Sequence, residues 1–347
     1  MQRSRLAGLH SCLHLTCAGL LVVLCPAAMA QNLTMNFSRT VEAADKGDMS
    51  AMVEVGKLYF SGGFTEPASK PDFAKAFHWF VRAYGEGSTQ GAAWLGRSYL
   101  TGRGTPVNED YGLELIRSAA SKGDPAGLRF LGITYESGKG VAQDYERAVT
   151  LFEQAIRAGD DESLDRLGSL YLRGLGVPQN VSKAVELFKK GAALGKSFAE
   201  FDLGRMYEYG APKAGIPQDY KVAISLYSKA AAQGNGRALY RLGLLHATGR
   251  GVEQNYEQAY TYYIGASRRS FPPALVALGE MEQLGLGRPV SLINAAIWYQ
   301  LASRSGHSEV AKQRAEALSA ELSEAELSVV RARIENFLNV QVEETEH

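Results

Sequence analysis

The feature that most constrains the fold of this chain is a repeat of about 36 residues. A glycine that follows Leu or Val recurs seven times, and four of the six intervals between these glycines are 36 residues long. The other two intervals, of 40 and 39 residues, indicate short insertions in loops of the first and fifth units. The recurrent glycines are Gly56, Gly96, Gly132, Gly168, Gly204, Gly243 and Gly279. Such a period is typical of repeat arrays, in which each unit packs only against its neighbours.

The residues inside each unit predict two helices. In the third unit, Asp124 is an N-cap candidate for a helix that ends near Ser137, because Gly138 follows as a helix breaker. Asp144 then begins a second helix that ends near Ala158. Seven such pairs predict an all-α chain.

A small residue on each second helix recurs in step with the glycine. These residues are Ala76, Gly112, Ala148, Ala184, Ala223, Ala259 and Ala295. Glycine inside a helix costs about 1 kcal/mol relative to alanine. The recurrence of glycine at the same position of every first helix therefore indicates that the two helices of a unit approach each other closely there.

The third unit carries the fullest form of a known pattern. Its matching residues are Leu131, Gly132, Tyr135, Gly138, Gly140, Val141, Gln143, Asp144, Tyr145, Ala148, Ala155 and Gly159. This pattern resembles the Sel-one-like repeat, a relative of the tetratricopeptide repeat, and the resemblance covers about residues 48–307. It implies a right-handed α/α superhelical solenoid that binds other proteins and has no shared chemistry. The seventh unit departs from the pattern, with Glu282 near the aromatic position and Arg288-Pro289-Val290 in the loop.

The first 30 residues have the features of a secretory signal peptide. Arg3 and Arg5 precede an apolar run from Leu13 to Cys25, and Ala28-Met29-Ala30 supplies small residues for cleavage before Gln31. The run is shorter than the ~20 residues that a spanning helix needs. We therefore expect a periplasmic or secreted protein that is not inserted in a membrane after cleavage.

The remaining chain divides into three parts. We expect an N-terminal capping helix over residues 31–47, the seven repeats over 48–307, and C-terminal capping helices with an acidic tail over 308–347. All three cysteines, Cys12, Cys17 and Cys25, lie within the expected signal peptide, so the mature chain has no thiol. Its near balance of acidic and basic residues excludes a strongly basic nucleic-acid binder. We expect a monomer.

The sequence does not predict a catalytic, cofactor-binding or metal-binding site. The mature chain's histidines, His78, His246, His307 and His347, lie in different units without metal-ligand spacing. Glycine-rich turns such as Gly138-Lys139-Gly140 lack the Lys-Ser ending of a phosphate loop. The protein is therefore predicted not to be an enzyme.

Three functions follow from the resemblance. The first is a non-catalytic interaction scaffold or adaptor of the cell envelope. The second is a structural component of a periplasmic export or motility assembly. The third, a β-lactam-binding hydrolase, is implied by secreted members whose helix pairs carry disulfides, and the lack of cysteine in the mature chain weakens it.

A stripe on the first helices is the candidate binding surface. The stripe consists of the residues three before, one after and four after each recurrent glycine, which are spaced i, i+4, i+7 and share a helix face. In tetratricopeptide relatives this stripe lines the concave groove. Because interface cores favour Arg and aromatic residues, we expect the following residues to contact an extended segment of a partner protein: Arg97, Arg129, Phe201, Arg205 and Tyr240. The alternative is that the stripe's apolar members pack between adjacent units.

Overall fold

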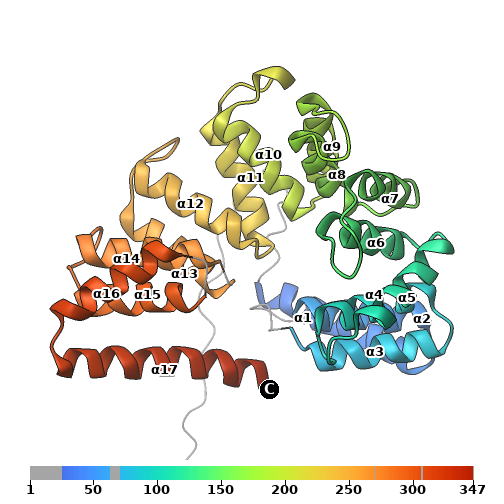
Figure 1. Cartoon of the computed structure of the whole chain (residues 1–347), viewed down its shortest axis with the longest axis horizontal. Coiled ribbons are helices and arrows are strands. Elements are labelled where there is room, and N and C mark those ends of the chain that lie inside the picture. The colour runs from blue at the N-terminus through green and yellow to red at the C-terminus, as the bar shows by residue number, and fades with distance from the viewer. Residues whose placement is uncertain (1–25, 63–70, 270, 306–307, 347) are drawn as a thin grey trace, which may run out of the picture.

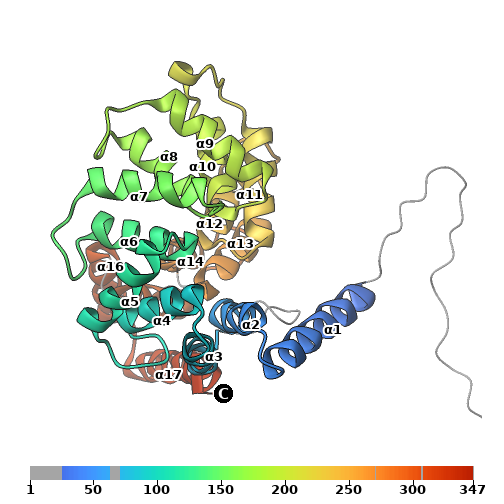
Figure 2. The same ribbon diagram turned by 90° about the vertical axis from the view of Figure 1, so that its right-hand side faces the viewer.

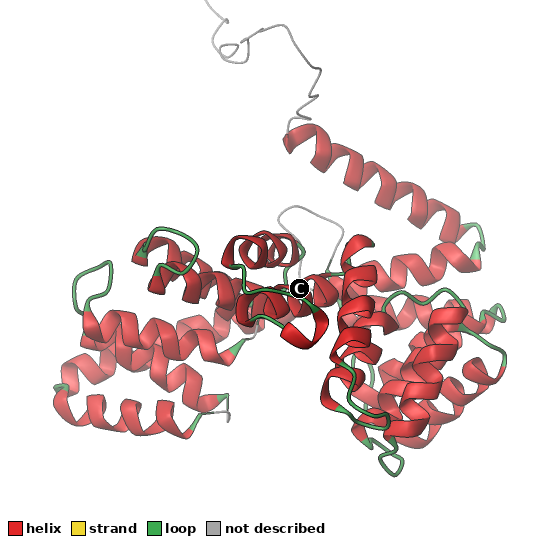
Figure 3. Cartoon of the chain, turned by 90° about the horizontal axis from the view of Figure 1, so that it is seen from above, coloured by secondary structure: helices red, strands yellow, loops and turns green. Residues whose placement is uncertain are grey.

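The protein is an all-α array of helix pairs. The computed structural model describes residues 26–62, 71–269, 271–305 and 308–346. Within these ranges it contains 17 α-helices, one short 3-10 helix and no strand (Figure 3). The prediction of an all-α fold is confirmed.

Each of the seven repeats contributes a first and a second helix. The first helices are α2 (Met49–Ser61), α4 (Thr89–Thr101), α6 (Pro125–Ser137), α8 (Ser163–Arg173), α10 (Ser197–Tyr209), α12 (Gly236–Thr248) and α14 (Pro272–Leu284). The second helices are α3 (Phe73–Gly85), α5 (Glu109–Ser121), α7 (Tyr145–Arg157), α9 (Val181–Ala193), α11 (Tyr220–Ala232), α13 (Tyr256–Arg268) and α15 (Leu292–Arg304).

The predicted helix ends of the third repeat are confirmed to within one residue. The Asp124 carboxylate accepts a hydrogen bond from the Gly127 amide at 2.7 Å and caps α6. Gly138 ends that helix in the left-handed conformation, with φ of 71°. In α7, the N-cap Asp144 accepts a hydrogen bond from the Arg147 amide at 2.9 Å. Local sequence therefore determines where these helices begin and end.

The recurrent glycine allows an aromatic ring to lie against its backbone. In six of the seven repeats, a β-carbon at this glycine would lie 2.4–2.7 Å from a ring carbon of the second helix. At Gly132 the ring is Phe152, which is fully buried. In the second repeat, Gly96 faces the carbonyl oxygen of Gly112 instead, at 2.6 Å from such a β-carbon. The two helix backbones therefore approach each other closely at the small residues of the second repeat, whereas in the other six the glycine makes room for the ring.

The helix pairs follow one another along an arc. In Figure 1 the arc rises from α2 and α3, passes over α10 and descends to α15. Each first helix packs against its own second helix, and each second helix packs against the next first helix. The array therefore curves round, so that its first and last repeats lie on opposite sides of one opening (Figure 1).

Additional helices extend the array at both ends. At the N-terminus, α1 (Pro26–Asp45) packs against α2 and otherwise stands away from the arc (Figures 2 and 3). It begins before the predicted cleavage site at Gln31, and the segment 1–25 lies outside the described residues. At the C-terminus, α16 (Glu309–Glu321) and α17 (Glu324–Glu346) both pack on α15, and α17 continues through most of the acidic tail.

The two predicted insertions lie between the helices of a pair. In the fifth repeat the insertion forms the 3-10 helix η1 (Pro212–Ala214), which a bridge between Ala211 and Ile216 closes. Ala211 and Ile216 are buried, so this loop adds to the core. The first repeat's insertion lies largely in residues 63–70, outside the described residues.

A candidate binding groove on the inner face

The inner face of the arc holds a cavity of about 780 Å³ over the first five repeats, which we call the polar cavity. Its walls come from α2, α4, α6, α8 and α10 and from the turns that precede α8 and α10. One cavity can touch five successive first helices only if they share a surface. The first helices of these repeats therefore share one surface, and stripe residues such as Arg97 and Asp165 line it.

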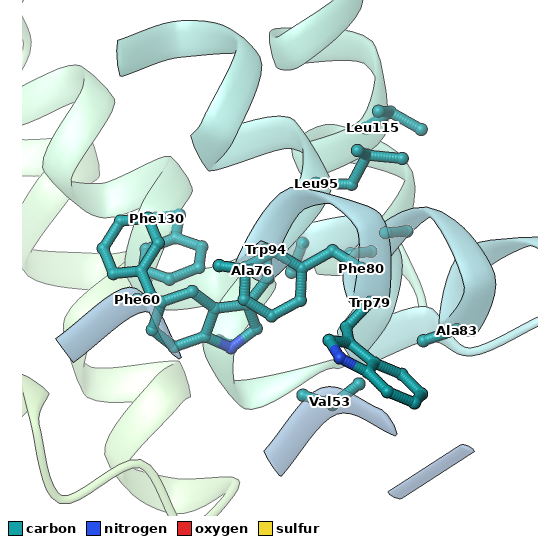
Figure 4. Packing of buried hydrophobic residues seen from close by; sticks show 14 of the residues in the cluster. Val53, Phe60, Ala76, Trp79, Phe80, Ala83, Trp94, Leu95, Leu115 and Phe130 are labelled. Atoms are coloured by element: carbon teal, nitrogen blue, oxygen red, sulfur yellow. The ribbon is translucent and has the colours of Figure 1, made fainter. Parts of the chain in front are cut away.

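Arg97 lies at the centre of an aromatic cage in the polar cavity. Its guanidinium carbon is 4.8 Å from the ring centroid of Phe60, 5.1 Å from Trp94 and 4.9 Å from Phe130. Figure 4 shows these three rings side by side, and they come from three successive repeats. Cations are attracted to aromatic faces at such distances. The cage therefore holds the Arg97 side chain in place.

Arg97 has no ion-pair partner among the residues that the structure describes. Burial lowers its pKa to about 9, and repulsion from Arg129, Arg103 and Arg166 acts in the same direction. The guanidinium still carries its charge at neutral pH. A positive charge that is largely withdrawn from water without a paired anion is costly.

Arg129 also lies in the polar cavity, but it is paired. Its Nε donates to Asp160 Oδ1 at 2.9 Å, and the two side chains are 12% and 8% exposed. Asp160 also accepts a hydrogen bond from the Ser163 hydroxyl at 2.6 Å. Arg129 therefore connects α6 to the turn that begins the next repeat, and the sequence did not predict this role.

The acidic groups of the polar cavity gather near α8. Burial raises the pKa of Asp165 to about 7, with Arg166 opposing the shift and Asp202 and Glu162 adding to it. Within the described ranges, the Asp165 carboxylate forms no ion pair or hydrogen bond with another residue. Its neighbour Glu162 pairs with Lys196 at 3.0 Å, and Arg166 pairs with Glu136 at 2.8 Å.

Arg205 and Phe201 are both on α10, but their environments differ. Arg205 is 38% exposed and lies 3.4 Å from Asp202. Phe201 is only 5% exposed, and its ring centroid is 5.7 Å from that of Tyr227 in the repeat core. The fifth repeat's own core covers the Phe201 ring, and a partner contact at Phe201 stays a prediction.

Tyr240 lines a second cavity of about 740 Å³, which we call the apolar cavity. Its walls come from the sixth and seventh repeats and include Leu244, Phe271, Val276 and Met281. The Tyr240 ring centroid lies 5.2 Å from Phe271. Stripe positions of the sixth and seventh repeats therefore line this cavity, as stripe positions line the polar cavity.

The five candidate residues do not form one site. Arg97 and Arg129 share the polar cavity, whereas Tyr240 lies in the apolar cavity. Arg205 is on the intervening α10, and Phe201 is buried. Trp94 and Asp165 also line the polar cavity, although neither was among the residues predicted to contact a partner. Asp165 is a stripe position, so its charge beside apolar neighbours was the available signal.

The described residues contain no cluster of three or more His, Cys, Asp or Glu side chains that could hold a metal ion. His246 occupies the aromatic position of the sixth repeat, 5.3 Å from the Tyr262 ring, and burial lowers its pKa. Among the helices described, none is long and apolar enough to cross a membrane.

Comparison with known structures identifies a similar solenoid. A Sel1 repeat protein from Oxalobacter formigenes shares 27% identity, with 83% of this chain and 82% of that chain covered and a TM-score of 0.57. A protective antigen present in uropathogenic Escherichia coli, which displays an SLR fold, shares 25% identity, with coverage of 88% and 72% and a TM-score of 0.42. The comparison of folds rests on the first of these. It supports the α/α solenoid predicted from the sequence.

The repeats themselves match a family model described as the Sel1 repeat. The matched segments are residues 50–88, 89–124, 125–160, 161–196, 197–235, 236–270 and 272–307. They agree with the seven units inferred from the glycine spacing, and together they cover most of the chain. The chain therefore belongs to the Sel1 repeat family, whose members generally mediate protein–protein interaction.

Proposed function

We propose that this protein is a non-catalytic adaptor of the cell envelope that binds an extended segment of a partner protein along its inner groove. The observation that carries the proposal is the polar cavity, in which five successive first helices converge on one surface. A solenoid that exposes a long concave surface is suited to an extended ligand. Arg97, Arg205 and Tyr240 are the groove residues that we expect to contact it.

Two features of the groove support a protein ligand. Aromatic side chains line both cavities, and arginines line the polar cavity; these residue types dominate the energetics of many interfaces. The cage around Arg97 also fixes that side chain before binding, which reduces the conformational entropy lost when a partner docks. The envelope location rests on the predicted signal peptide over residues 1–30.

Site-specific photo-crosslinking tests the proposed function. A photo-reactive amino acid is placed at Lys57, Arg205 or Tyr240 in the groove, and crosslinking is carried out in the native host. Positions Glu114 and Arg157, exposed on second helices, are the matched controls. We expect one partner to crosslink from the groove positions and not from the controls.

A double substitution provides the second arm of the test. Arg97→Gln together with Arg205→Gln should reduce capture of the crosslinked partner at least about tenfold, since charged interface groups contribute this much or more. The melting temperature should change little. Crosslinks from the second-helix positions alone would contradict the groove assignment and indicate the outer face.

A further inference from the structure

Among the charged residues that line the polar cavity, Arg97, Asp161 and Asp165 form no ion pair in the described part of the chain. Arg97 is caged by rings but has no carboxylate within ion-pair distance in the described part of the chain. Asp165 on α8 is half-buried and forms no ion pair within the same described residues, because Arg166, which attracts its charge, pairs with Glu136 instead. Both line the same cavity.

Most other charged residues of the cavity are paired. Lys57 pairs with Glu54 at 2.7 Å, Arg129 pairs with Asp160 at 2.9 Å, and Lys196 pairs with Glu162 at 3.0 Å. Arg166 pairs with Glu136, and Asp161 lies in the turn before α8, at the same end of the cavity as Asp165. The unmatched charge is therefore positive at α4 and negative at α8.

A second unsatisfied donor lies beside Arg97. The indole Nε1–H of Trp94 is buried and finds no hydrogen-bond acceptor in the described structure. Trp94 precedes Arg97 by three residues on α4, and both line the polar cavity. Donors without acceptors at this end favour a ligand group that only accepts hydrogen bonds, and an ionised carboxylate is such a group.

We propose that the partner segment carries an acidic side chain that pairs with Arg97 and a basic side chain that pairs with Asp165. The inference rests on the proposed function and specifies the chemistry of the segment that the groove binds. Charge-assisted hydrogen bonds to groups withdrawn from water are strong, so these two pairs would set the position and direction of the segment.

The helix spacing limits the separation of the two side chains. Packed helices lie about 8–10 Å apart, and α4 packs against α6, so two steps of this size along the cavity from α4 to α8 span roughly 20 Å. An extended chain advances about 3.3 Å per residue. The acidic and basic residues of the segment should therefore be no more than about six residues apart.

Synthetic peptides test this inference. Four extended decapeptides share a neutral backbone sequence and carry an Asp and a Lys, the Asp alone, the Lys alone, or neither. The acid–base peptide is made with several Asp-to-Lys spacings in both chain directions. Fluorescence anisotropy with the full mature chain measures affinity. We expect the best acid–base peptide to bind at least about tenfold tighter than the neutral peptide.

Two variants assign the pairs. Arg97→Gln should abolish the advantage of the acid–base peptide over the Lys-only peptide. Asp165→Asn should abolish its advantage over the Asp-only peptide. The controls Arg157→Gln and Glu114→Gln remove a positive and a negative charge from second helices and should leave all four affinities unchanged.

The outcomes separate this inference from the proposed function. Equal binding of all four peptides, no binding of the acid–base peptide, or preferences that survive both variants would each overturn the charge pairing. The groove itself would still be tested by the crosslinking, which does not depend on the peptides. Failure of the groove crosslinks would overturn both.

Discussion

The two ends of the groove have the same framework and different surfaces. In the third repeat, Gly132 lies against Phe152, and in the sixth, Gly243 lies against Tyr263 in the same way. The first repeat has the same framework, with Gly56 against Phe80, yet the stripe position after the recurrent glycine is Lys57 there and Leu244 in the sixth repeat. The packing positions and the groove positions of a repeat can therefore change independently.

This difference divides the recognition of a partner into two kinds of contact. If the groove binds a partner as we propose, the charged groups of the polar cavity would determine which partner fits and in which direction. The apolar cavity contains aromatic and aliphatic side chains, so contact area contributes more there than charge. The following predictions test this division, from the largest expected effect to the smallest.

Substitution of Arg129 should destabilise the polar end most. In Arg129→Gln the buried Asp160 carboxylate loses its partner, and we expect a loss of about 2–4 kcal/mol in the free energy of unfolding. Arg97→Gln removes a caged but unpaired charge and should cost less than about 1 kcal/mol. Urea unfolding of the two variants measures both values. Equal costs would contradict the distinction between a structural and a binding arginine.

Substitution of the recurrent glycine should have the same effect at both ends. A β-carbon would lie 2.7 Å from the Phe152 ring at Gly132 and 2.5 Å from the Tyr263 ring at Gly243. We expect Gly132→Ala and Gly243→Ala each to cost about 1–3 kcal/mol, because the ring has to move out of a tightly packed core.

Gly265 provides the matched control for these glycines. It also lies inside a helix, but the nearest atom to its β-carbon would be 3.4 Å away, on Leu239. Gly265→Ala should therefore stabilise the protein by about 0.5–1 kcal/mol through helix propensity alone. If the two ends responded differently to their glycine substitutions, the framework would not be common to them.

The framework could be predicted from sequence because local signals determine it. The caps Asp124 and Asp144 and the breaker Gly138 act within a few residues, and the recurrent glycine marks close packing in every repeat. The seventh repeat departs from the sequence pattern, and residues within the same repeat accommodate this departure. Glu282, 2% exposed, pairs with Arg288 at 2.8 Å, so the two unusual residues of that repeat compensate each other.

Whether a groove residue is buried, caged by rings or paired with an opposite charge could not be predicted in the same way, because contacts with neighbouring residues and repeats determine it. The stripe places Phe201 and Arg97 on one side of their helices, but contacts from other residues bury Phe201 and cage Arg97. Arg129 is paired by Asp160 of the following turn, 31 positions along the chain. Helical periodicity predicts the face of a side chain but not what covers it.

Replacement of Asp165 should stabilise the free protein. The native carboxyl has a pKa of about 7 against 3.8 for an ordinary aspartate, because burial disfavours its charge. The native state therefore keeps a proton that the unfolded state has lost between these pH values, and the stability that Asp165 contributes falls as pH rises through this window. Arg166 faces the carboxyl as the opposing cation, and Asp202 and Glu162 add repulsion.

Asp165→Asn removes this charge at every pH. We expect the variant to be about 1–2 kcal/mol more stable than the wild type at pH 8, since water at a partly exposed site reduces the full effect of the shift. The gain should disappear below about pH 4, where both states of the wild type are protonated. Urea unfolding across this pH range checks the prediction. A gain that did not depend on pH would indicate that repacking, and not charge, is responsible.

The smallest effect is expected at the apolar end, from removal of the Tyr240 hydroxyl. The described structure shows no side-chain hydrogen bond from this group, and the ring contacts Phe271 and Tyr263 through its faces and edges. Tyr240→Phe keeps these contacts, so the free energy of unfolding should change by less than about 0.5 kcal/mol. Tyr240→Ala removes the ring from the cavity wall and should cost about 1–3 kcal/mol. Partner capture should follow the same order, with the Phe variant close to wild type and the Ala variant weaker. A strong loss of capture in Tyr240→Phe would mean that the hydroxyl donates a hydrogen bond to the partner, and the apolar end would then take part in polar recognition as well.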